Sequence, residues 1–155
     1  PRSTPLYSSA ASDVYKRQNT ICESDHLFAT RLWQNNSKVH FDINARDNRK
    51  RLVYGGHVIS LVRALSFNGL ENAQMIIGIN GGTHANPVFA NDTIYCWSEV
   101  LDKIDLNIRN IAALRLRTVG AKDKDHSMIV TSGDGKYLPS IVLDFDYWVL
   151  IPKEL

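Results

Sequence analysis

The chain has 155 residues, which is enough for one folded domain and short of two typical ones. Its 18 lysine and arginine residues nearly balance its 16 acidic residues, so the charge gives no sign of a nucleic-acid or anionic-membrane partner. No apolar run approaches the roughly 18 residues of a membrane span, and the first residues lack the order of a secretion signal. Two cysteines are too few for a disulfide framework or a zinc site. We therefore expect a protein of the reducing cytoplasm that binds no metal.

The first segment, residues 1–18, differs in composition from the rest. It is rich in Ser, Pro and Ala and has neither a helical nor a strand period. We expect it to be disordered or a non-native leader, and we assign the folded domain to residues 19–155.

A first helix is predicted over residues 21–34. Thr20 and Glu23 have the spacing at which each side chain caps the backbone N–H of the other, so the helix should begin at Thr20. Its apolar residues recur at helical spacing and should pack as one stripe onto a core. The stripe consists of Ile21, Leu27, Phe28 and Leu32.

A second helix should follow the glycine pair Gly55-Gly56. In residues 56–68 apolar side chains occupy nearly every side of about three turns, which predicts a helix buried all round. Gly69 can adopt the left-handed conformation that ends a helix. Such a helix suits a sheet that wraps around it.

The remainder of the chain is predicted to form strands. Over 140–151 apolar residues alternate with Asp144 and Asp146, so one face of the sheet should be buried. Turns are expected at 132–135 and 91–92. The predicted strands cover residues 75–80, 93–101, 111–120 and 140–151. A buried helix followed by antiparallel strands indicates an α+β fold, with a curved sheet around a central helix.

Long strings of the chain, in order and with matching spacing, resemble the C-terminal hot-dog domain of the mesaconyl-CoA (2-methylfumaryl-CoA) hydratases. They are ATRLWQNNSKVHFD, RLVYGGHVISLVRALSFNGLENAQ, THANPVFANDTIYCWSEVLDK, ALRLRTVGAKD and VLDFDYWVLIPK. More loosely, the chain is similar to the MaoC-like dehydratases. The resemblance implies a hot-dog fold with residues 56–68 as the central helix. It also implies an upstream strand and a whole upstream hot-dog domain, neither of which is recognisable here, so we expect the C-terminal half of a double hot-dog enzyme.

The resemblance implies catalytic residues as well. His40 stands where MaoC-like enzymes place the catalytic histidine, and an imidazole that titrates near neutrality suits the activation of water. Asn35 aligns with the catalytic aspartate of the wider family, and an amide can orient water or substrate but cannot act as a base. Asp42 can assist His40. The plain alternative is that His40 is a histidine packed in a loop.

Donors for a developing oxyanion are expected at the start of the second helix, from the backbone N–H groups of Gly56 and His57 after Gly55. A tight turn onto the helix is the alternative for the glycine pair. His57 and His84 can line an acyl pocket or be core histidines. Candidate cations for a substrate carboxylate are Arg31, Arg51 and Arg63. The alternative for each is a solvated arginine on the surface. We assign Arg31 to substrate binding.

The resemblance therefore implies a hydro-lyase that reversibly adds water to 2-methylfumaryl-CoA to give β-methylmalyl-CoA, with an acyl-CoA as substrate and no cofactor. Two alternatives stay open: a non-catalytic hot-dog half that provides an interface and part of the acyl-CoA groove, and a hot-dog acyl-CoA thioesterase. Hot-dog sheets pair side by side, so a homodimer or pairing with a second hot-dog domain is expected.

Overall fold

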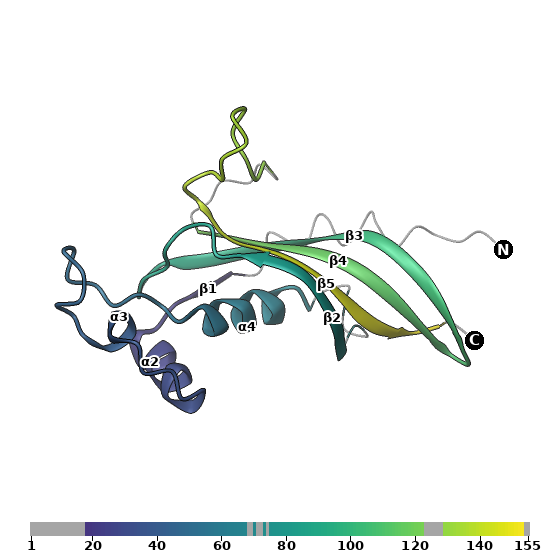
Figure 1. Ribbon diagram of the computed structural model, residues 1–155, viewed down its shortest axis with the longest axis horizontal. Coiled ribbons are helices and arrows are strands. Elements are labelled where there is room, and N and C mark those ends of the chain that lie inside the picture. The colour runs from purple at the N-terminus through teal and green to yellow at the C-terminus, as the bar shows by residue number, and fades with distance from the viewer. Residues whose placement is uncertain (1–17, 68–69, 71–72, 74, 123–128, 154–155) are drawn as a thin grey trace.

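The computed structural model describes residues 18–67, 70, 73, 75–122 and 129–153. One five-stranded antiparallel sheet curves over a helix, α4 (Gly55–Leu65), and two shorter helices lie at one end of it (Figure 1). This is the predicted α+β arrangement of a curved sheet around a central helix. No helix in the described part of the chain is long and apolar enough to cross a membrane.

The sheet has the strand order β1-β3-β4-β5-β2, and every neighbouring pair is antiparallel. Its strands are β1 (Gln18–Thr20), β2 (Met75–Thr83), β3 (Thr93–Ile108), β4 (Ile111–Lys122) and β5 (Ile141–Pro152). The four predicted strands are all present, and each runs further along the chain than expected. The β3–β4 hairpin is the longest part of the sheet and extends past the end of α4 (Figure 1).

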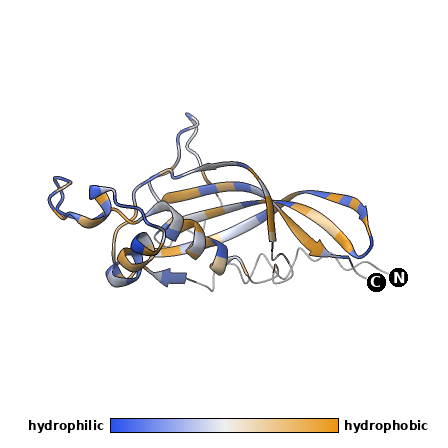
Figure 2. Cartoon of the chain, turned by 60° about the horizontal axis from the view of Figure 1, so that its bottom comes forward, coloured by the Kyte–Doolittle hydropathy of each residue, from blue (hydrophilic) through white to orange (hydrophobic). Residues whose placement is uncertain are grey.

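The side chains of β5 alternate between the two faces of the sheet as predicted. Phe145, Tyr147 and Val149 are buried in the core that faces α4. Asp144 and Asp146 lie on the opposite face, where each forms a two-bond ion pair with an arginine of β4, Arg117 and Arg115 respectively. Figure 2 shows the resulting alternation of polar and apolar residues along the strands.

The central helix is less enclosed than its sequence predicts. Val58 and Val62 are buried against the sheet, whereas Ser60 and Ala64 are exposed. The prediction of burial on nearly every side was therefore wrong, because the single sheet covers only one side of α4. The helix ends at Leu65, and the predicted terminator Gly69 lies outside the described residues.

The first helix, α2 (Glu23–Leu32), begins later than predicted and turns a different face inward. Its N-cap is Cys22, and no capping box forms, because the Thr20 hydroxyl lies in β1 and bonds to the Thr93 hydroxyl at 2.8 Å. The prediction that Phe28 and Leu32 pack onto the core was also wrong, since they are 64% and 65% exposed. The buried residues of α2 are His26 and Thr30, and of the predicted stripe Ile21 alone lies in the core.

A short strand precedes α2, although none was recognisable in the sequence. β1 pairs with the start of β3, with Gln18 opposite Tyr95 and Thr20 opposite Thr93. Ile21 then continues the contact through two backbone bonds of 2.9 Å, from its N–H to the Asp92 carbonyl and from the Asn91 N–H to its own carbonyl. These bonds fix where α2 leaves the sheet.

The two predicted turns are confirmed. Asn91 adopts a left-handed conformation with φ of 74°, and the Asp92 N–H bonds to the Phe89 carbonyl. Gly135 has φ of 79° in the hairpin turn at 132–135, where the Ser132 N–H bonds to the Lys136 carbonyl. Both turns use residues that tolerate positive φ, as the sequence indicated.

Candidate active site

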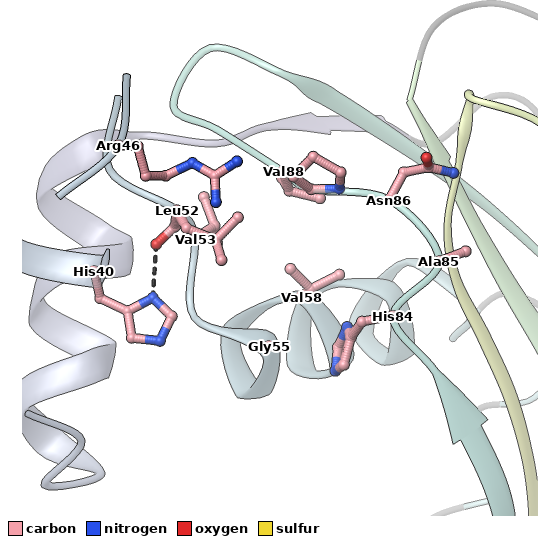
Figure 3. Close-up of a pocket in the computed structure, with 11 residues that line it drawn as sticks. His40, Arg46, Leu52, Val53, Gly55, Val58, His84, Ala85, Asn86 and Val88 are labelled. Atoms are coloured by element: carbon pink, nitrogen blue, oxygen red, sulfur yellow. Dashed lines mark hydrogen bonds between the residues drawn. The ribbon is translucent and has the colours of Figure 1, made fainter. Parts of the chain in front are cut away.

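A pocket of about 390 Å³ lies between the first turn of α4, the segment that precedes it and the chain between β2 and β3 (Figure 3). One backbone bond, from the Val53 N–H to the Val88 carbonyl at 2.9 Å, holds the two connecting segments together. The pocket is lined by His40, Arg46, Leu52, Val53, Gly55, Val58, His84, Ala85, Asn86, Pro87 and Val88. Of the residues predicted from the sequence, the structure therefore brings His40, Gly55 and His84 together.

His40 lies on the short helix α3 (Lys38–Phe41) and is 8% exposed. Its Nδ1 is 2.8 Å from the Leu52 carbonyl oxygen (Figure 3). A carbonyl only accepts, so Nδ1 carries the proton, and in the neutral ring Nε2 is left with a free lone pair. The Tyr54 ring packs edge-on against the imidazole, with 5.8 Å between ring centres. His40 is thus held in the tautomer that a general base needs at Nε2.

Asn35 and Asp42 flank α3 but do not line the pocket. The Asn35 Oδ1 accepts the Ser37 N–H at 2.9 Å, and the Asp42 Oδ1 accepts the Asn44 N–H at 2.8 Å. In this structure both side chains serve local turns. Their predicted contributions to catalysis remain predictions.

The first turn of α4 supplies unpaired backbone donors. The N–H groups of Gly55 and Gly56 have no acceptor among the described residues, whereas the N–H of His57 bonds to the Tyr54 carbonyl at 3.0 Å. The predicted donor pair of Gly56 and His57 is therefore better described as Gly55 and Gly56. Unpaired N–H groups at a helix N-terminus favour bound negative charge.

Side-chain crowding explains why both positions are glycine. A Cβ on Gly55 would lie 2.6 Å from His84 Nε2, and a Cβ on Gly56 would lie 2.5 Å from the Tyr54 ring. His84 therefore lies against the start of α4, and burial lowers its pKa below the ordinary histidine value. The lowered pKa disfavours the charged imidazole beside the helix N-terminus.

The remaining predicted residues lie outside the pocket lining. Burial lowers the pKa of His57, and Asp25 opposes this effect. Arg31 is exposed on α2. The other two candidate arginines have structural partners: Arg51 pairs with Glu23, and Arg63 donates to the Ala73 carbonyl. Among the described residues, the lysine or arginine that does line the pocket is Arg46.

Sequence reasoning missed Arg46 and His26. Arg46 lies between the His40 and Gly55-Gly56 motifs, and its place between two site motifs was the available signal. His26 is fully buried on α2, and neither ring nitrogen has a partner in the described part of the chain. Burial lowers its pKa, with further influences from Glu23, His57 and His40. Nothing in its sequence context distinguished it from a surface histidine.

The described residues contain no group of three or more His, Cys, Asp or Glu side chains placed to hold a metal ion. Cys22 is exposed and Cys96 is buried, and neither is in a disulfide.

Two curated proteins are similar to most of the chain. Mesaconyl-CoA hydratase of Cereibacter sphaeroides is 58% identical over 134 residues, which are 86% of this chain and 39% of the relative. Beta-methylmalyl-CoA dehydratase of Chloroflexus aurantiacus is 53% identical over 139 residues, covering 86% of this chain and 40% of the relative. The chain thus spans about two fifths of the length of these relatives. No protein-family model matches it.

Solved structures agree with these sequence matches. A MaoC domain dehydratase from Chloroflexus aurantiacus superimposes with a TM-score of 0.85 at 50% identity, over 91% of this chain and 42% of that chain. The chain is a hot-dog domain related to mesaconyl-CoA hydratase. A Mycobacterium tuberculosis protein described as a double hot-dog fold has a TM-score of 0.64 at 15% identity, over 89% of this hot-dog domain and 40% of that chain, which supports the fold alone.

Proposed function

We propose that this hot-dog domain catalyses the reversible addition of water to 2-methylfumaryl-CoA (mesaconyl-CoA), giving β-methylmalyl-CoA. The observation that carries the proposal is the meeting of two features in one pocket. One is a buried histidine whose Nδ1 is fixed by a carbonyl, and the other is a helix N-terminus with unpaired N–H groups. Relatives at 58% and 53% identity bear the names of this hydratase and of the dehydratase for the reverse direction.

The geometry suggests how the residues divide the work. His40 Nε2 accepts a proton from water as the water oxygen adds to the β carbon of the unsaturated thioester. The negative charge that develops on the thioester oxygen is stabilised by the N–H groups of Gly55 and Gly56. The proton then passes from the His40 imidazolium to the α carbon, so that the elements of water are added across the double bond and His40 returns to its neutral form.

The pocket favours a hydratase over a thioesterase. A hot-dog thioesterase needs a carboxylate near the thioester carbonyl, and the described residues that line the pocket include no aspartate or glutamate. The non-catalytic alternative rests on Asn35, which stands in place of the family aspartate and here caps a turn.

We also propose that the domain pairs with a second hot-dog unit, either another copy or a second domain, through the edge strand β2. Within the described part of the chain this strand is bonded on one side only, to β5, and its apolar residues are exposed. The exposed residues are Met75, Ile76, Ile77 and Ile79. An uncovered apolar edge invites pairing with another strand.

The proposal is tested by hydration of 2-methylfumaryl-CoA, followed by loss of the enoyl-thioester absorbance. The purified chain should turn the substrate over, and His40→Ala should lower kcat by about 10²- to 10⁴-fold, the usual contribution of a general base. Val39→Ala is the matched control, because it loosens the same short helix without removing the imidazole. A folded wild-type chain that binds the ester without turnover would favour the non-catalytic alternative.

A further inference from the structure

Arg46 is the cationic side chain of the pocket that is not explained by the proposed hydration chemistry. It lies on the segment between α3 and α4, and its side chain extends toward Val53 and Val88 (Figure 3). Its guanidinium carbon is 5.7 Å from the centre of the Phe89 ring, and the Lys50 ammonium is also 5.7 Å from that centre. Two cations therefore share one aromatic ring, and Arg46 is the one that lines the pocket.

The hydrogen-bonding groups of Arg46 are incompletely used. Its Nε is buried and has no partner among the described residues. None of the described residues that line the pocket is acidic, so none of them neutralises the guanidinium. The buried Nε is closed to an incoming ligand, whereas no hydrogen bond within the described residues uses the terminal N–H groups of the guanidinium. These terminal groups are the donors that a ligand in the pocket can meet. The planar guanidinium fits a carboxylate through two parallel hydrogen bonds, so an anionic oxygen pair is the ligand chemistry that suits it.

The size of the pocket indicates which part of an acyl-CoA lies beside Arg46. At about 390 Å³ the pocket is near the lower end of the range of roughly 300–1,000 Å³ for small-ligand sites. It can hold a short branched acyl chain, while the much larger coenzyme A moiety must extend outside. Apolar walls from Leu52, Val53, Val58 and Val88 surround the acyl position. A cation inside these walls therefore faces the acyl chain and not the phosphates of coenzyme A.

We propose that Arg46 binds a free carboxylate at the far end of the acyl chain and thereby selects dicarboxylic monothioesters over neutral acyl-CoA esters. This inference rests on the proposed function, since it takes the thioester oxygen to lie at the Gly55 and Gly56 N–H groups. The reacting carbons then lie near His40, and the terminal carboxylate extends toward Arg46.

Binding of saturated esters tests the inference without turnover. The probes are 2-methylsuccinyl-CoA, which carries the terminal carboxylate, and 2-methylbutyryl-CoA, in which a methyl group replaces it. Isothermal titration calorimetry on the full 155-residue chain should give a dissociation constant at least about 10-fold lower for the carboxylated ester. Arg46→Gln should raise that constant about 10- to 100-fold and change the constant for the neutral ester less than about 3-fold. Arg46→Lys should retain part of the preference, because it keeps the charge and loses the paired hydrogen bonds.

Lys50→Gln is the matched control, because it removes a cation from the same Phe89 ring outside the pocket lining and should leave both constants unchanged. The inference would be overturned if Arg46→Gln, still folded by circular dichroism, bound both esters more weakly by the same factor. It would also be overturned if the wild-type chain bound the two esters with equal affinity, or bound neither of them. A chain that shows the preference but hydrates nothing would refute the proposed function and leave the role of Arg46 standing. A chain that hydrates 2-methylfumaryl-CoA but binds the two saturated esters equally would support the proposed function and refute the role of Arg46.

Discussion

Replacing Gly120 with alanine should destabilise the contact between the central helix and the sheet. Gly120 is a buried residue of β4, and an added Cβ would lie 2.6 Å from Val62 Cγ2 on α4, well inside the 3.4 Å at which ordinary contact begins. Val62 is 1% exposed and β-branched, so its methyl group cannot rotate away cheaply. The helix or the strand must move instead.

The expected magnitude follows from two opposing effects. Overpacking a core costs about 1–3 kcal/mol, while replacing glycine returns about 0.4–1 kcal/mol by restricting the unfolded chain. We expect a net loss of about 1–2 kcal/mol in the free energy of unfolding. With a urea dependence of about 2 kcal/mol per molar, the midpoint of urea unfolding should fall by roughly 0.5–1 M.

Gly81→Ala is the matched control, since it is another strand glycine with no atom within 4 Å of the added Cβ. Its midpoint should stay within the equivalent of about 0.5 kcal/mol of wild type. The double variant Val62→Ala/Gly120→Ala should be less destabilised than the sum of the single variants, because the smaller side chain makes room for the new methyl group. Equal midpoints for Gly120→Ala and Gly81→Ala would refute the reasoning.

Three further predictions concern buried or paired ionisable groups. Burial lowers the pKa of His26, so as the pH falls below about 6.5 this histidine is protonated in the unfolded chain before it is protonated in the folded one, and the free energy of unfolding decreases. His26→Leu should therefore narrow the difference between the urea midpoints at pH 7.5 and pH 5.5. An unchanged difference would contradict this. Burial raises the pKa of Cys96 to about 12, so iodoacetamide at pH 8 should alkylate Cys22 in the folded chain and Cys96 only after denaturation, as mass spectrometry would show. A hydrogen bond from Arg117 lowers the pKa of Asp144, so Asp144→Asn should lower the free energy of unfolding at pH 7 by about 1 kcal/mol, as measured by urea unfolding. The difference from wild type should disappear as the pH falls through the lowered pKa of Asp144. A difference that persists in acid would exclude the ion pair as its cause.

The strands were predictable because their pattern is local. A period of two in residues 140–151 is compatible with one arrangement only, in which the apolar residues face a core and Asp144 and Asp146 face away. The partners of those carboxylates, Arg115 and Arg117, showed the same alternation in their own strand. Pairing of the two strands then followed from the fold and not from either pattern alone.

The first helix was harder to predict because periodicity tells which residues share a face and not which face is buried. The backbone bonds of Ile21 to Asp92 and Asn91 fix the exit of the chain from the sheet, and the ion pair of Arg51 with Glu23 holds the first turn. The helix is consequently rotated so that His26 points inward and Phe28 outward. The predicted capping box does not form for a related reason. The Thr20 hydroxyl is hydrogen-bonded to the hydroxyl of Thr93, a residue distant in sequence.

The sequence by itself predicted the α+β class of the fold and the central helix after Gly55-Gly56, since both depend on local patterns of apolar residues and glycines. The family resemblance pointed to His40, and its acid–base role stays a prediction. Tertiary structure alone decided which side chains share a pocket. The pocket joins segments around His40, Arg46, Gly55 and His84 that meet because the chain before α4 is hydrogen-bonded to the chain between β2 and β3. That contact forms between residues far apart in sequence, and it depends on the path of the backbone around the sheet, which no local pattern encodes.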